Sequence, residues 1–100
     1  MEEILARLAA ANIQLLPLTH IENHFVFERD GFISLVERAR DGGFGRIGAA
    51  GLLTERGMAM PIERSSRMLF VAKGLELEAT GQQIAALRAF DSDLRAALAP

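Results

Sequence analysis

The stretch HFVFERDGFISLVER, residues 24–38, contains the strongest local signal in this sequence. Two runs rich in aromatic and β-branched residues flank Asp30-Gly31, and Asp-Gly between such runs is typical of a type I′ hairpin turn. A two-residue turn at this point places His24 opposite Glu37 at the far end of the hairpin. Because side chains alternate along a strand, both faces of this hairpin then carry large apolar groups.

Residues 58–73 repeat this pattern around Ser65-Ser66, which we interpret as a second turn. Apolar side chains again fall on both faces of the predicted hairpin. Pro61 lacks the N–H that a central strand needs, so we expect a sheet edge or a bulge there. Leucines alternate with glutamates over residues 75–78 and extend the last strand.

Two helices are predicted at the ends of the chain. Residues 2–11 form a short one, followed by an extended edge segment over residues 13–18. Residues 81–98 form the clearest helix, because Thr80 and Gln83 together make a capping box at its start. Its apolar stripe has helical spacing. The stripe consists of Ile84, Leu87, Phe90, Leu94 and Leu98.

These elements predict one α+β domain over residues 1–100, with an antiparallel sheet of about five or six strands and both helices packed on one face. The outline also resembles a rolled, pleckstrin-homology-like small barrel capped by the C-terminal helix, and this remains the alternative architecture. Residues 49–56 fit a two-turn helix and a glycine-bent strand with a turn equally well.

Composition excludes several classes of protein. The chain has 100 residues, half of them apolar, a net charge of −2 and no cysteine. Near-neutral charge argues against nucleic acid as a partner, and no window is apolar and long enough to span a membrane. The absence of cysteine and of a basic, apolar leader predicts a cytoplasmic protein. Arginine far outnumbers lysine, which we associate with a bacterial source.

The run Gly43-x-Gly45-x-x-Gly48 matches the dinucleotide-binding fingerprint letter for letter. The context does not fit, because the preceding residues 37–41 are mostly charged where a buried strand should end. We therefore favour a glycine-rich loop or bulge in a β-domain. A smaller anion site built from Gly45, Arg46 and Gly48 is the alternative.

His20 and His24 have the spacing of two metal ligands on one helical turn, but on a strand they lie too far apart to share an ion. No serine stands in a nucleophile motif, and we expect no catalytic residue, no metal and no cofactor. The candidate ligand-binding residues, taken from the glycine run and the neighbouring hairpin, are Gly45, Arg46, Gly48, His24 and Glu37.

Two helices cannot cover both faces of a sheet of this size, yet both hairpins are apolar on both faces. Either the sheet closes on itself or a second copy covers the open face, and we expect a homodimer. The sequence favours a small non-enzymatic binding or regulatory module that self-associates through its sheet. The alternative is a small enzyme or a small-molecule or anion-binding protein with its site near residues 43–48.

Overall fold

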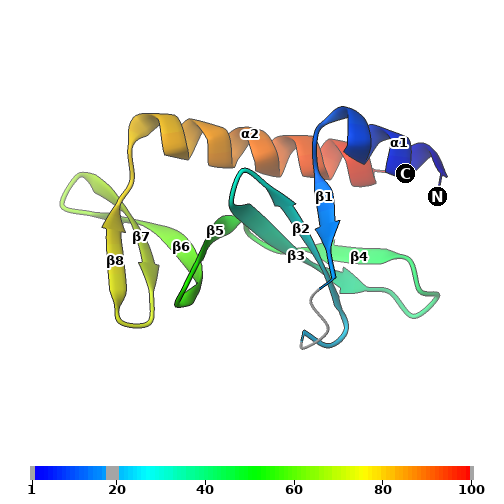
Figure 1. Ribbon diagram of the computed structural model, residues 1–100, viewed down its shortest axis with the longest axis horizontal. Helices are drawn as coiled ribbons and strands as arrows, with labels where there is room; N and C mark the ends of the chain where they lie inside the picture. The colour runs from blue at the N-terminus through cyan, green and yellow to red at the C-terminus, as the bar shows by residue number, and fades with distance from the viewer. Residues whose placement is uncertain (1, 18–20, 100) are drawn as a thin grey trace.

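The computed structural model describes residues 2–17 and 21–99, which form two helices and eight strands (Figure 1). The strands make one antiparallel sheet in the order β1-β2-β3-β5-β6-β7-β8, and β4 also pairs with β3. The α+β class is confirmed. The strand count exceeds the expected five or six because the ambiguous glycine-rich stretch supplies two strands. The elements are α1 (Glu2–Ala10), β1 (Gln14–Leu16), β2 (His24–Arg29), β3 (Phe32–Arg38), β4 (Phe44–Ile47), β5 (Gly51–Thr54), β6 (Gly57–Arg64), β7 (Arg67–Ala72), β8 (Leu75–Glu78) and α2 (Gly81–Leu98).

The hairpin of β2 and β3 has the predicted register, with His24 opposite Glu37. Asp30 has φ 53° and Gly31 has φ 88°, and a type I′ turn requires positive φ at both of these positions. The hairpin of β6 and β7 turns at Ser65 and Ser66 with φ 53° and 65°, so it adopts the same kind of conformation without glycine.

Pro61 lies within β6 without breaking it. It pairs in register with Phe70 of β7, while the last pair between β5 and β6 is Leu52 with Ala59. At Pro61, the edge of β6 that faces away from β7 therefore no longer pairs with β5. The missing N–H removes no sheet hydrogen bond there, as expected for a local edge.

β4 and β5 act as one kinked strand that faces β3 along its whole length. From the Val36–Ile47 pair to the Ile33–Gly51 pair, β3 advances three residues while the facing chain advances four. An extra residue of this kind bends a strand and increases its twist. Residues 49–56 thus form a glycine-bent strand and a turn, not a helix.

Glycine allows the kinked strand to approach its neighbours closely. A Cβ on Gly51 would lie 2.6 Å from the carbonyl oxygen of Ala59, and one on Gly48 would lie 3.0 Å from that of Leu35. Any side chain at Gly51 would push β5 away from β6. The bend of the sheet therefore depends on residues without a Cβ.

The bend divides the sheet into two lobes that share one covering helix. In Figure 1, β1 to β4 form one lobe, β6 to β8 form the other, and α2 runs across the top of both. The terminal strands β1 and β8 do not pair, so the sheet is a curled half-barrel and not the closed barrel of the alternative architecture. The core lies between α2 and the inner face of the sheet. Its largest fully buried side chains include Phe27, Phe70, Phe90 and Leu94.

Both ends of α2 are held by side chains. Thr80 Oγ1 accepts from the Gln83 N–H at 3.0 Å, and Gln83 Oε1 accepts from the Thr80 N–H at 2.8 Å, which confirms the predicted capping box. At the other end, Arg7 of α1 donates to the carbonyl oxygens of Ala97 and Ala99. A cation at this position also favours the negative end of the helix dipole.

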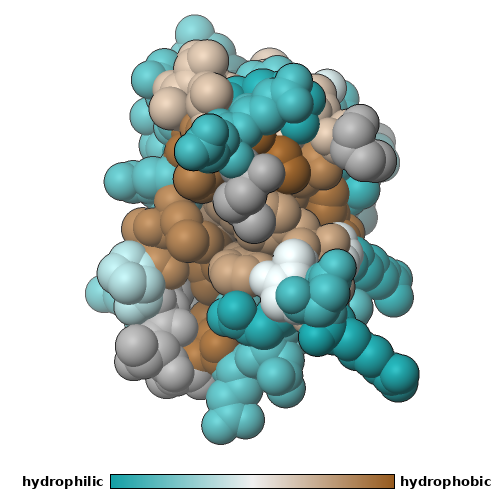
Figure 2. All heavy atoms as spheres, turned by 90° about the vertical axis from the view of Figure 1, so that its right-hand side faces the viewer, coloured by the Kyte–Doolittle hydropathy of each residue, from teal (hydrophilic) through white to brown (hydrophobic). Residues whose placement is uncertain are grey.

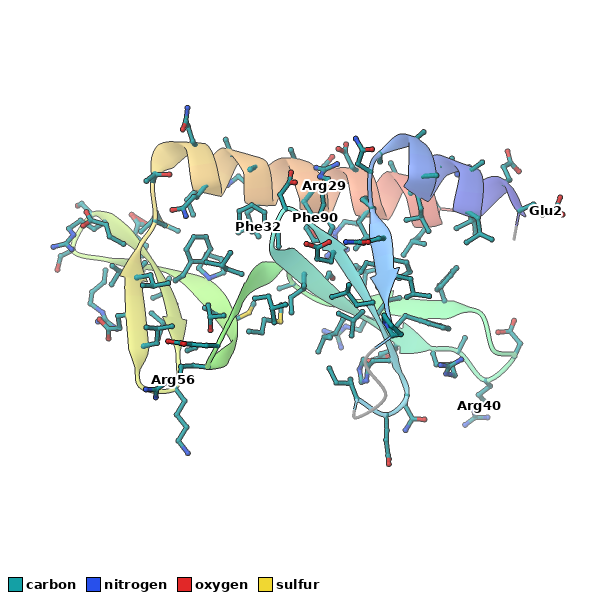
Figure 3. All side chains as sticks on the ribbon, viewed as in Figure 1. Glu2, Arg29, Phe32, Arg40, Arg56 and Phe90 are labelled. Carbon is teal, nitrogen blue, oxygen red and sulfur yellow. The ribbon has the colours of Figure 1, made fainter. Side chains whose placement is uncertain are left out.

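Arg29 joins three elements beneath α2 (Figure 3). Its guanidinium donates to the Ala11 carbonyl oxygen and to Asp93 Oδ2, both at 2.9 Å, and lies 5.7 Å from the centre of the Phe90 ring. The Arg29 side chain is only 17% exposed. This contact links the segment after α1, strand β2 and helix α2.

The end of the core nearest α1 is closed by aromatic side chains. The Phe25 and Phe44 rings meet edge to face at 5.0 Å, and Arg38 lies over the Phe25 ring at 4.2 Å. Figure 2 shows this end of the molecule, where apolar side chains gather in the middle and hydrophilic ones surround them.

We expect Gly51→Ala to lower the free energy of unfolding by about 1–3 kcal/mol, because its Cβ overpacks against the β6 backbone. Gly81→Ala is the matched control, since nothing lies within 4 Å of its Cβ position at the start of α2. That variant should be neutral or up to about 1 kcal/mol more stable. Urea denaturation followed by circular dichroism measures both, and equal midpoints would contradict the close-approach role of Gly51.

Replacing Arg29 with methionine should lower the free energy of unfolding by about 1–3 kcal/mol, because the half-buried Ala11 carbonyl loses its donor. Arg64→Met is the control, because Arg64 forms an ion pair with Glu76 in which both side chains are 53% exposed. Exposed ion pairs of this kind contribute at most about 1 kcal/mol to stability. The same denaturation experiment compares the two variants. A larger loss of unfolding free energy for Arg64→Met would contradict the role of Arg29 in linking the segment after α1, β2 and α2.

Candidate functional site

The sheet face opposite α2, which we call the outer face, carries apolar side chains from five neighbouring strands. Both helices of the described residues lie on the other side of the sheet (Figure 1). The strand pairings place alternate residues of each hairpin on this face. Its apolar members are Val26, Ile33, Leu35, Leu53, Met58, Met60, Ile62, Leu69 and Val71.

A groove of about 290 Å³ lies on the outer face where the sheet bends. It brings together four of the five ligand-binding residues predicted from the sequence: His24, Glu37, Arg46 and Gly48. Four strands, β2, β3, β4 and β6, and the bend after β4 supply its walls. The candidate residues, which are up to 24 positions apart in the chain, therefore share one surface feature.

His24 and Glu37 are placed by the first hairpin, where they form the last pair of the register. Counting alternate pairs back from the turn makes this a non-hydrogen-bonded pair, in which the side chains lie closest. The His24 Nδ1 is 2.9 Å from the carbonyl oxygen of Glu22. Because a carbonyl oxygen only accepts, Nδ1 carries a proton and Nε2 of the neutral ring remains an acceptor.

Arg46 and Gly48 come from β4 and the bend that follows it. The Gly48 N–H donates to the Leu35 carbonyl at 2.9 Å, and the buried Ser34 hydroxyl donates to the Gly48 carbonyl at 2.9 Å. These two bonds anchor the bend where the regular ladder is interrupted. Gly45 does not line the groove, and its Cβ position lies 3.1 Å from the Glu37 carbonyl oxygen.

The glycine run does not build a dinucleotide site. Such a site needs a helix that begins at the glycines, so that its N–H groups face the phosphates. Here Gly43 precedes β4, Gly45 lies inside it, and the chain continues after Gly48 into β5. The run instead provides the bulge that bends the sheet, as the favoured interpretation of the sequence predicts.

The charged groups of the groove are not paired with each other. Four ion pairs within 4 Å occur among the described residues, and none of them involves Glu37, Arg46 or His24. Glu37 and Arg46 are both exposed. One negative and one positive group therefore face the same groove with their hydrogen-bonding capacity available.

The remaining walls are apolar, and sequence reasoning did not assign them to the site. Leu35, Met58 and Met60 line the groove beside Ala49. The alternation of residues had placed both methionines on one face of their strand. The glycine run predicted a loop or bulge at this place, but it did not indicate that the bend would bring this face of β6 to Arg46.

Of the two histidines with the spacing of metal ligands, only His24 is among the described residues. His20 lies outside the described residues, and His24 stands on β2 as expected. Within residues 2–17 and 21–99, no three His, Asp or Glu side chains are grouped as metal ligands. In the same part of the chain, neither helix has the length and apolar character needed to cross a membrane.

Comparison with known proteins returned no match to a protein-family model, to a curated protein or to a solved structure.

Ser34→Ala should lower the free energy of unfolding by about 1–3 kcal/mol, because the Gly48 carbonyl loses the donor that anchors the bend. Ser34 is fully buried, so water does not replace the hydroxyl easily. Ser92→Ala on the exposed side of α2 is the control and should be neutral or slightly stabilising. Thermal and urea unfolding measure both variants. Equal losses at the two serines would contradict the anchoring role.

Proposed function

We propose that this protein is a small non-enzymatic binding or regulatory module that pairs with a second copy of itself through the outer face. The apolar side chains that stay exposed or half-buried on this face, from β3, β5, β6 and β7, are the observation that carries this proposal. Val26, Ile33 and Leu69 of the same face are already buried within one chain. Leu53 and Ile62 are 44% and 40% exposed on this face, and Met58, Met60 and Val71 are only half buried. Soluble monomers rarely leave a continuous apolar patch of this kind uncovered.

The dimensions of the molecule are compatible with a stable pair. Its principal extents are 43 × 27 × 18 Å. A standard interface buries ~800 Å² of each partner, about an eighth of the 6572 Å² of accessible surface of one chain. A two-fold axis in this face gives a closed dimer with one self-complementary surface.

The edges of the sheet are poor sites for a partner strand, which favours pairing through the face. β1 has three residues and is followed by Pro17, while β8 has four residues and carries Glu76 and Glu78. Short strands, proline and charge are devices that prevent the addition of another strand. Pro61 has the same effect on the free part of β6.

A cytoplasmic setting fits this proposal, because a chain without cysteine forms no disulfide and so gains nothing from an oxidising compartment. The excess of arginine over lysine is the observation that favours a bacterial source.

The second candidate function is binding of a small molecule or anion, or a small enzyme, with the site near residues 43–48. The groove that unites His24, Glu37, Arg46 and Gly48 is the observation that favours it. A thermal-shift screen of metabolites, nucleotides and metals tests this function, since a ligand at 100 times its Kd adds about 2.7 kcal/mol of stability.

We expect the protein to sediment as a dimer of twice 10.9 kDa at micromolar concentration. Ile62→Lys should convert it to a monomer by placing a charge in the apolar interface. Leu77→Lys is the matched control, because Leu77 is equally exposed at 40% but lies on the helix side of β8, opposite Phe70. Circular dichroism verifies that both variants fold. A wild-type monomer at all concentrations, or dissociation by Leu77→Lys alone, would overturn the proposal.

A further inference from the structure

We propose that the groove on the outer face binds a free α-amino acid with an apolar side chain, as a zwitterion. One wall carries an unpaired carboxylate, another an unpaired guanidinium, and the remaining walls are aliphatic or thioether side chains. These are the complements of the three parts of such a molecule: its ammonium group, its carboxylate and its side chain.

The charges select a ligand that bears both signs. Arg46 can hold a carboxylate through two parallel N–H donors. Glu37 lines the same groove and repels phosphate and simple anions, while Arg46 equally disfavours simple cations. A zwitterion satisfies both side chains and leaves the net charge of the groove unchanged, so neither group remains desolvated without a partner.

His24 adds an acceptor beside Glu37. Its Nδ1 is held by the Glu22 carbonyl, so Nε2 of the neutral imidazole is available to accept an N–H. An ammonium group has three donors to satisfy, and a carboxylate with a neighbouring imidazole accepts two of them. This pair follows from the hairpin register, in which His24 lies opposite Glu37.

The apolar wall and the size of the groove restrict the side chain of the ligand. Leu35, Met58 and Met60 offer an aliphatic surface, and methionine adapts to different apolar shapes. At about 290 Å³ the groove lies at the lower limit of small-molecule sites. It therefore suits a single amino acid better than a nucleotide or a long-chain lipid.

Isothermal titration calorimetry with four probes tests this inference on the intact protein. L-leucine carries all three features, N-acetyl-leucine lacks the ammonium group, leucinamide lacks the carboxylate, and glycine lacks the side chain. We expect L-leucine to bind and each of the other probes to bind at least about tenfold more weakly, as the loss of a charge-assisted hydrogen bond or of apolar contact implies. Absence of L-leucine binding to both the wild type and the monomeric Ile62→Lys variant, or equal binding of leucinamide or N-acetyl-leucine, would overturn the proposal.

Variants locate the binding in the groove. Glu37→Gln and Arg46→Gln should each weaken L-leucine binding about tenfold or more. Their matched controls are Glu63→Gln and Arg40→Gln, which alter exposed residues outside the groove; Arg40 lies on the loop between β3 and β4 (Figure 3). Unchanged affinity in the two groove variants would place any binding elsewhere and refute the assignment.

This inference does not rest on dimer formation, although the groove lies on the face that a second copy would cover. Calorimetry reports the ligand, and sedimentation with Ile62→Lys reports the association, so either can fail alone. Ile62 is not among the groove residues, and the monomeric variant should retain the same preference for L-leucine over leucinamide. Loss of that preference would contradict a site complete within one chain.

Discussion

The extra residue between Ile47 and Gly51, in the strand facing β3, is the constraint on which the rest of the structure depends. Between the Val36–Ile47 and Ile33–Gly51 pairs, three residues of this strand oppose two on β3, so the strand must bend where the ladder is interrupted. Ser34 and Gly48 make this arrangement stable, because a buried hydroxyl satisfies the carbonyl that the ladder leaves free. A straight strand at this position would give a flatter sheet with different faces.

The two faces of the sheet follow from this bend. On the inner face the lobes come together under α2, and one long helix covers the core of both. On the outer face, side chains on either side of the bend line the groove that contains Arg46, Met58 and Met60. Arg29 and Arg7 then hold the helices in place by donating to carbonyl oxygens that the ends of α1 and α2 leave free.

The proposed functions use different properties of the outer face. Association depends on the row of apolar side chains on this face, which gains free energy when water is excluded from it. Ligand recognition adds the charged and polar groups His24, Glu37 and Arg46 to Leu35, Met58 and Met60 of the same row. If both occur, each site lies within reach of the other, and occupation of the groove and the formation of a dimer are linked through shared surface.

Several features were determined by the sequence alone, because they depend on neighbours along the chain. The turn at Asp30-Gly31 fixed the register that pairs His24 with Glu37, and Thr80 with Gln83 marked the start of α2. Local patterns could not decide whether residues 49–56 are helix or strand, since their glycines permit both. Only the tertiary structure decided this, because the close contact of Gly51 with the Ala59 carbonyl exists only once β6 is in place. The same long-range packing brought Met58 and Met60 to Arg46, and so created the groove from residues that the sequence could name only separately.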